Sequence, residues 1–149
     1  MGYRSEVCLV VALRSKTQAD ELMSVYALNP LVQQNDLVGK WNRHVRDDVV
    51  FLVFHDESIK WYAEYEHVQG MEHLLDLART FNNERTDVGW IEDGSDKPEL
   101  TDGFPYAAYK IRIGEELQDI EEEAHCSEDS LQSDIYDRAY ITRAITINF

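Results

Sequence analysis

The segment "EVCLVVAL", residues 6–13, decides the fold. It is a short apolar run, rich in β-branched residues and without polar alternation, which is typical of a strand buried on both faces. Such a strand needs neighbours along both edges and cover on both faces. We therefore expect residues 6–13 to form a central strand of a sheet, and the rest of the chain to supply its partners.

The rest of the chain predicts three helices and five further strands. Ser15 and Gln18 form a capping box that predicts a helix over 16–28, and Asn29-Pro30 ends it and begins a short second helix. Apolar residues at helical spacing predict another helix over 67–81. The remaining strands are expected at 47–54 and 58–65, joined as a hairpin by residues 55–57, and at 86–94, 106–114 and 140–149.

This order of elements predicts an α+β protein, a two-layer sandwich with a ferredoxin-like β-α-β-β-α-β core. We expect a single domain over 1–149, with a core over about 1–114, an acidic segment at 114–137 and a C-terminal strand at 140–149. Two helices cover only one face of the sheet, yet strands 6–13 and 49–54 are apolar on both. Either the C-terminal segment or a second copy, in a homodimer, is therefore expected to cover the other face.

Negative charge is concentrated in one part of the chain. The protein has 29 acidic and 14 basic residues and a net charge of −15, and residues 114–137 alone hold ten acids and no Lys or Arg. Phosphate contacts need Lys and Arg, so direct binding to nucleic acid is not expected. A host protein with a basic nucleic-acid-binding groove is the partner that this charge suits.

The acidic segment is predicted to be a docked helix, because Leu117, Ile120 and Ala124 share a helical face. A second stripe, Leu131, Ile135 and Ala139, follows it. The carboxylates either form a solvated face that keeps the protein soluble or imitate the phosphates of nucleic acid. Under the second interpretation, the partner-binding residues are Glu115, Glu116, Asp119, Glu122, Glu123, Glu128 and Asp129, together with Tyr62 and Tyr65 as aromatic anchors.

No catalytic motif is present in the sequence. The five histidines are scattered, the acids around Cys126 raise rather than lower a cysteine pKa, and the acidic loop 92–103 lacks the register of a calcium loop. We predict no catalytic residue, no metal and no cofactor. A small enzyme or ligand-binding domain remains an alternative, which a deep pocket would favour. Trp61, in "KWYAEY", is expected in the core.

The chain is expected in a reducing cytoplasm and away from membranes. The apolar run at 7–13 is too short to span a bilayer and ends in Arg14 and Lys16, and no signal peptide is indicated. Cys8 and Cys126 form no CxxC motif and no disulfide framework.

Three stretches together resemble a family of small acidic proteins common in bacteriophages and prophages. They are "MGYRSEV", "IKWYAEYEHVQGMEHLL" and "YKIRIGEELQDIEEE". Members typically open M-G-Y-R-S-[DE]-V, carry a K-W-Y strand, and have an R-[IM]-G-E strand end followed by acids. The similarity covers most of the chain outside residues 15–46 and 93–104. It implies a phage origin and expression in the cytoplasm of a bacterial host, and it carries over no catalytic residue.

Small acidic phage proteins are often counter-defence factors, including anti-CRISPRs and DNA mimics. The leading hypothesis is therefore a phage-encoded interaction protein that inhibits a host nucleic-acid-handling complex through its acidic surface. The alternatives are a phage accessory protein with a solubilising acidic face, and a small ferredoxin-like enzyme or ligand-binding domain.

Overall fold

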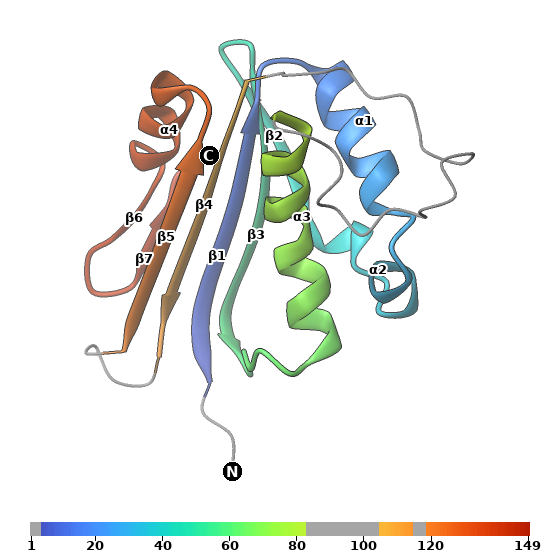
Figure 1. Ribbon diagram of the computed structural model, residues 1–149. Helices are drawn as coiled ribbons and strands as arrows, with labels where there is room; N and C mark the ends of the chain where they lie inside the picture. Colours follow the sequence, from blue (N-terminus) through green and yellow to red (C-terminus); the bar gives the residue numbers. More distant parts are fainter. Residues whose placement is uncertain (1–3, 83–104, 115–118) are drawn as a thin grey trace.

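The computed structural model describes residues 4–82, 105–114 and 119–149. Within them, five strands form one antiparallel sheet in the order β2-β3-β1-β4-β5 (Figure 1). Their bounds are β1 Ser5–Leu13, β2 Asn42–Arg46, β3 Val49–Ile59, β4 Tyr106–Ile113 and β5 Ile120–Cys126. The prediction of an α+β protein with an antiparallel sheet is confirmed, while the finer prediction of a ferredoxin-like core stays a prediction.

Strand β1 lies in the middle of the sheet, as its sequence predicts. Val10 pairs with Val53 of β3 on one side and with Tyr109 of β4 on the other. The pleat sends alternate side chains to opposite faces. Leu9 and Val11 face one hydrophobic cluster, here called the α3 face, and Cys8 and Val10 face the other, here called the α4 face. Both faces of β1 are therefore buried.

The α3 face is covered by helices α1 (Lys16–Tyr26), α2 (Pro30–Gln34) and α3 (Glu66–Asn82), with a short 3-10 helix at Val38–Lys40. The predicted helices are confirmed, including the short one that begins at Pro30. Ser15 caps α1 by accepting a hydrogen bond from the backbone N–H of Gln18 at 3.2 Å. Trp61 packs in the same layer, so the prediction that it is a core residue is also confirmed.

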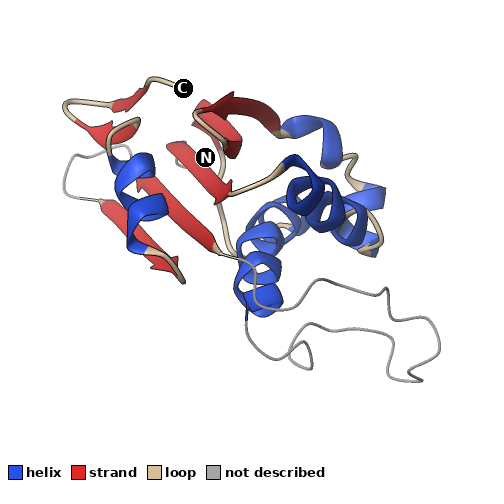
Figure 2. Ribbon diagram, turned by 90° about the horizontal axis from the view of Figure 1, so that it is seen from above, coloured by secondary structure: helices blue, strands red, loops and turns tan. Residues whose placement is uncertain are grey.

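The C-terminal segment covers the α4 face with helix α4 (Asp129–Tyr136) and a hairpin of β6 (Ala139–Ile141) and β7 (Ile145–Ile147). Figure 2 shows the sheet between this layer and the helices of the α3 face. The predicted apolar stripe Leu131, Ile135 and Ala139 is fully buried. Two predictions are wrong here: the sandwich has three layers rather than two, and residues 140–149 form a short hairpin rather than one strand. The face that motivated the homodimer is covered within one chain.

The predicted hairpin of 47–54 and 58–65 is wrong in its position. Strand β3 continues through His55-Asp56-Glu57, and its hairpin partner is the preceding strand β2, through a turn at Asp47-Asp48. Both turn residues have positive φ, 50° and 66°, as a tight two-residue hairpin requires. Residues 60–65 are not a strand. Strand β2 was not predicted because its sequence, "NRHVR", is polar and largely exposed and therefore has no hydrophobic pattern.

The predicted acidic helix is wrong where the structure describes it, because residues 120–126 form the edge strand β5. In a helix, the acids three and four residues apart would repel one another. In the strand, Glu121 and Asp119 lie beside Lys110 and Arg112 of β4 instead. Ile120, expected to be buried, is 44% exposed. The predicted strand at 86–94, the loop 92–103 and Leu117 lie outside the described residues.

Candidate functional site

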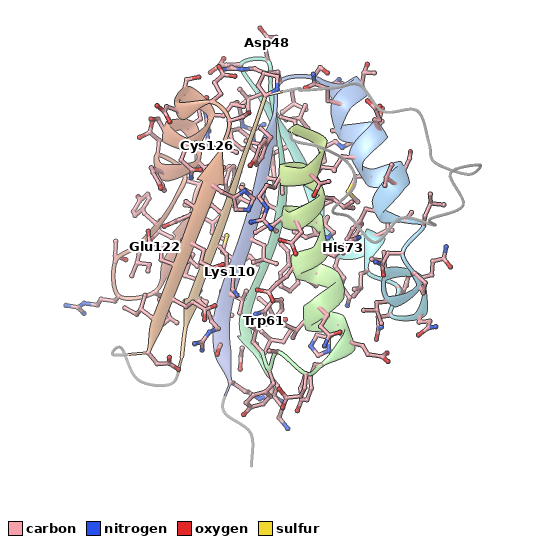
Figure 3. The ribbon with its side chains drawn as sticks, in the orientation of Figure 1. Asp48, Trp61, His73, Lys110, Glu122 and Cys126 are labelled. Carbon is pink, nitrogen blue, oxygen red and sulfur yellow. The ribbon has the colours of Figure 1, made fainter. Side chains whose placement is uncertain are left out.

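The acidic edge of the sheet is strand β5, which pairs with β4 and stands last in the strand order. Its carboxylates lie on both faces. Glu123 is opposite Lys110 and Glu122 is opposite Ile111, so Glu121 and Glu123 share the α3 face while Glu122 lies on the α4 face. Figure 3 shows Glu122 on β5, away from Lys110 and helix α3. The edge strand therefore presents negative charge in two directions.

Several of these carboxylates are paired within the chain. Asp119 accepts hydrogen bonds from both terminal nitrogens of Arg112, at 3.1 and 3.3 Å. Glu121 Oε1 lies 2.6 Å from Lys110 Nζ. Glu122 accepts a hydrogen bond from the Tyr109 hydroxyl on the α4 face. These contacts join β5 to β4 by side chains as well as by the backbone ladder.

Two further acids, Glu128 and Asp129, lie at the start of α4. Arg14, which follows β1, donates from Nε to Glu128 Oε2 at 3.2 Å, and a second ion pair joins the same two side chains. These contacts with Arg14 hold the pKa of Glu128 below its ordinary value. Asp129 lies 3.7 Å from the Cys126 thiol, and burial together with this hydrogen bond raises the pKa of Cys126, as its acidic surroundings predict.

The structure thus divides the predicted partner-binding residues into groups. Asp119 and Glu128 are paired with arginines, although Asp119 is also exposed. Glu122, Glu123 and Asp129 are exposed and form no ion pair in the described part of the chain, and Glu122 keeps its hydrogen bond from Tyr109. Glu115 and Glu116 lie outside the described residues. Tyr62 and Tyr65 form an edge-to-face ring pair, with centroids 5.2 Å apart, in the loop before α3. Tyr62 meets Asp119 at a common cavity, and Tyr65 packs against the core.

This cavity has a volume of about 540 Å³ and lies between α3, the loop 61–63 and strands β4 and β5. Lys110 and Arg112 contribute its two cations, with side chains only 10% and 17% exposed. The remaining lining residues bring three carboxylates, two aromatic rings and small or apolar groups: Glu72, Asp119, Glu121, Trp61, Tyr62, Ser5, Ala63 and Val68. Figure 3 shows Lys110 and Trp61 beside α3.

Lys110 is the centre of the charge network in this cavity. Its Nζ contacts Glu72 of α3 and Glu121 of β5, so it joins the helical layer to the edge strand. Burial lowers the pKa of Lys110, but the hydrogen bonds to Glu121 and Glu72 outweigh burial and raise it overall. Lys110 is therefore fully charged at neutral pH. Arg112 completes the network with a hydrogen bond to Ser5 Oγ at 3.2 Å.

Trp61 forms one wall of the cavity and is 8% exposed. Its ring stacks on Phe54, with centroids 5.9 Å apart and an interplanar angle of 25°. The indole N–H is buried and has no hydrogen-bond partner in the part of the chain that the structure describes. A buried donor without a partner is costly, and native structures contain few of them.

Sequence reasoning missed the basic half of this site. The pattern "YKIRI" contained a signal, because Lys110 and Arg112 stand two apart in an otherwise apolar strand and so share a face. Glu72 gave no signal, since one acid on a helix is ordinary. Glu121 belongs to the acidic segment but is not among the predicted partner-binding residues.

Burial shifts the pKa values of three further side chains, which lie outside the cavity. Burial lowers the pKa values of His73 and His125, and burial raises the pKa of Cys8 to about 12, so that its thiol stays protonated. Within residues 4–82, 105–114 and 119–149, no group of three or more His, Cys, Asp or Glu side chains is arranged to hold a metal ion.

Comparisons with protein-family models, with curated proteins and with solved structures found no match for this chain. Among the described residues, no helix is long and apolar enough to cross a membrane. The edge strand β5 and the cavity are therefore the features of this chain that bear on its function.

Proposed function

We propose that this chain is a phage-encoded interaction protein that inhibits a nucleic-acid-handling complex in the cytoplasm of a bacterial host. Its acidic edge would occupy the basic groove in which that complex binds nucleic acid. The observation that carries the proposal is β5, an edge strand with carboxylates on both faces. The resemblance to small acidic phage proteins, among which anti-CRISPRs and DNA mimics occur, supports the same conclusion.

The spacing of the carboxylates suits such a role. Asp119, Glu121, Glu122 and Glu123 fall within five consecutive residues. An antiparallel strand rises about 3.4 Å per residue, and each strand of duplex DNA carries a phosphate about every 3.4 Å along the axis. One carboxylate per residue along an extended strand therefore matches the phosphate spacing of one nucleic-acid strand, while carboxylates on the same face of the strand lie about 7 Å apart.

Ion pairs within the chain reduce the number of carboxylates that are available to a partner. Asp119 and Glu121 share their charge with Arg112 and Lys110, so they hold the strand in place. Glu122, Glu123 and Asp129 are exposed and carry the proposed contact with the partner. Backbone pairing of β5 with β4 fixes the positions of Glu122 and Glu123 before binding, which lowers the entropic cost of association.

We also propose that β1 to β4 with α1 and α3 form a ferredoxin-like core, extended by β5 and by the C-terminal layer. The support is the position of β1 between β3 and β4, with all neighbours antiparallel and both helices on the α3 face. This proposal concerns the fold and assigns no activity.

The test begins with tagged protein incubated in host lysate, followed by mass spectrometry of the captured complex. The captured complex is then purified and mixed with fluorescent duplex DNA or RNA. We expect the chain to displace the nucleic acid, and the double variant Glu122→Gln/Glu123→Gln to displace it more weakly while keeping its fold. If the chain does not compete with nucleic acid for any captured complex, the acidic edge is a solubilising surface and the proposal is wrong.

A second candidate function is the binding of a small molecule. The cavity of about 540 Å³ favours this function. Its volume lies within the range of about 300–1,000 Å³ that is usual for ligand sites. Binding of a small metabolite to the free protein, with no effect of the β5 variant on function, would favour this candidate over the interaction protein.

A further inference from the structure

The cavity between α3, the loop 61–63 and strands β4 and β5 lies beside the acidic edge but is chemically different from it. It combines fixed charges of both signs with aromatic walls. We propose that it binds the guanidinium group of an arginine side chain, and that this arginine belongs to the basic protein partner. Binding of a guanidinium group concerns only the cavity, whereas the origin of the arginine in a partner rests on the proposed function.

The charge balance of the cavity favours a cation. Glu72, Asp119 and Glu121 contribute three carboxylates, whereas Lys110 and Arg112 contribute two positive charges. One negative charge remains uncompensated, in a protein whose net charge is −15. An anionic ligand would have to displace carboxylates from Lys110 and Arg112 and would be repelled by the rest of the chain. A cationic group is attracted by the net charge of the chain and can use the remaining carboxylate charge without displacing Lys110 or Arg112.

Glu72 provides the free acceptor. Its Oε1 contacts Lys110 Nζ, while no partner of Oε2 is found in the described part of the chain, and about a third of its side chain is exposed to solvent. Asp119, by contrast, uses both oxygens on Arg112. A guanidinium group carries five N–H donors in one plane, so it can bind Glu72 and still donate to Glu121 at the same site.

The aromatic walls favour guanidinium over ammonium. Trp61 and Tyr62 both line the cavity, and arginine stacks on aromatic faces while keeping its in-plane donors for carboxylates. The Trp61 indole N–H is buried and has no partner in the described part of the chain, so its NMR signal is a reporter of changes at this wall of the cavity. Arginine in a partly desolvated pocket with aromatic residues is also a common energetic centre of protein interfaces.

The test uses the free protein and a defined probe. Nα-acetyl-arginine amide is titrated into ¹⁵N-labelled protein, and Nα-acetyl-citrulline amide, which has nearly the same shape but no charge, is the matched control. The Trp61 indole signal is assigned by its loss in Trp61→Phe. We expect the arginine probe to shift this signal and the amide of Glu72 saturably, and the citrulline probe to leave both unchanged.

Two variants locate the binding. Glu72→Gln removes the free carboxylate but keeps the size of the side chain, and it should weaken binding of the arginine probe about tenfold or more. Asp76→Asn removes one charge from the same helix outside the cavity, where Asp76 forms an ion pair with Arg79, and should leave the affinity unchanged. The wild-type titration with the two probes decides the proposal even if Glu72→Gln does not fold.

Three results would overturn the inference: no saturable shift with the arginine probe, equal shifts with arginine and citrulline probes, or shifts with inorganic phosphate alone. The last would identify an anion site on Lys110 and Arg112. These results are separable from failure of the proposed function. If arginine amide binds but no complex is inhibited, the cavity assignment stands alone. If inhibition depends on Glu122 and Glu123 but the probe does not bind, only the cavity assignment fails.

Discussion

Glu6 on β1 accepts a hydrogen bond from the backbone N–H of Ile145 on β7, with an oxygen-to-nitrogen distance of 2.9 Å. Its other carboxylate oxygen lies 2.8 Å from Nε2 of His55 on β3. One side chain near the start of the chain therefore ties the last hairpin to two strands of the sheet. The hairpin completes the cover of the α4 face. The burial of Cys8 and Val10 of β1 depends on this cover.

We expect Glu6→Ala to lower the free energy of unfolding by about 1–3 kcal/mol, because it leaves the N–H of buried Ile145 without a partner. Hydrogen exchange of the Ile145 amide should become faster in this variant. Glu6→Gln, which keeps an oxygen acceptor, should restore most of the protection. Glu57→Ala, at an exposed position of β3, is the matched control. Equally slow exchange of Ile145 in Glu6→Ala would contradict the role of the carboxylate.

The C-terminal layer yields a paired prediction. Ile135 of α4 is fully buried, so Ile135→Ala should cost about 2–5 kcal/mol of stability. Ile120 of β5 is 44% exposed, so Ile120→Ala should change stability by no more than about 0.5 kcal/mol. A docked acidic helix would require a large loss for Ile120 as well. Urea unfolding of the two variants side by side therefore tests the strand assignment of residues 120–126.

The parts of the fold with a strong hydrophobic signal could be predicted from sequence. The predicted strand over 6–13 corresponds to β1 in the middle of the sheet, and the predicted helices over 16–28 and 67–81 correspond to α1 and α3 on one face, because burial imposes a clear pattern on each. The sequence also shows the stripe Leu131, Ile135 and Ala139, but it leaves open whether the C-terminal segment or a second copy covers the other face; in the structure this stripe of the C-terminal segment packs there.

The edge strands could not be predicted, because their stability comes from partners that sequence does not reveal. β2 is polar and is held by pairing with β3. In the acidic segment, Leu117, Ile120 and Ala124 suggest a helical face, but from Asp119 onward the contacts to Lys110 and Arg112 of β4 favour the extended form. The acidic half of the candidate site was therefore found in the wrong secondary structure, and the cavity was not foreseen at all.

Stability should fall in mildly acidic solution because of His73 and His125. Burial lowers the pKa of both, with nearby Arg79 acting in the same direction on His125 and Asp76 opposing it for both. The unfolded chain therefore binds these protons at a higher pH than the folded protein. Their contribution to stability is complete above the unfolded value of about 6.5 and is lost as pH falls towards the folded values.

Urea unfolding between about pH 7.5 and 5 measures this effect. We expect the free energy of unfolding of the wild-type protein to decrease over this interval. The double variant His73→Gln/His125→Gln should show a shallower decrease, because Gln does not titrate. Identical slopes for the two proteins would show that the decrease comes from other groups.

The last prediction separates acids that hold the fold from acids that meet the partner. Exposed charges at an interface act mainly on the association rate and on its salt dependence. We therefore expect Glu122→Gln/Glu123→Gln to slow association with the captured partner and to make the rate less dependent on salt. Asp119→Asn removes a charge that already compensates Arg112, so it should change the association rate much less.

The measurement is the association rate, by surface plasmon resonance, over about 50–300 mM salt, where screening shortens the Debye length from about 14 to 6 Å. Equal effects of Asp119→Asn and the double variant would mean that the partner senses only the net charge of the protein. A larger effect of Asp119→Asn than of the double variant would indicate that the partner contacts the rim of the cavity rather than the outer edge of β5.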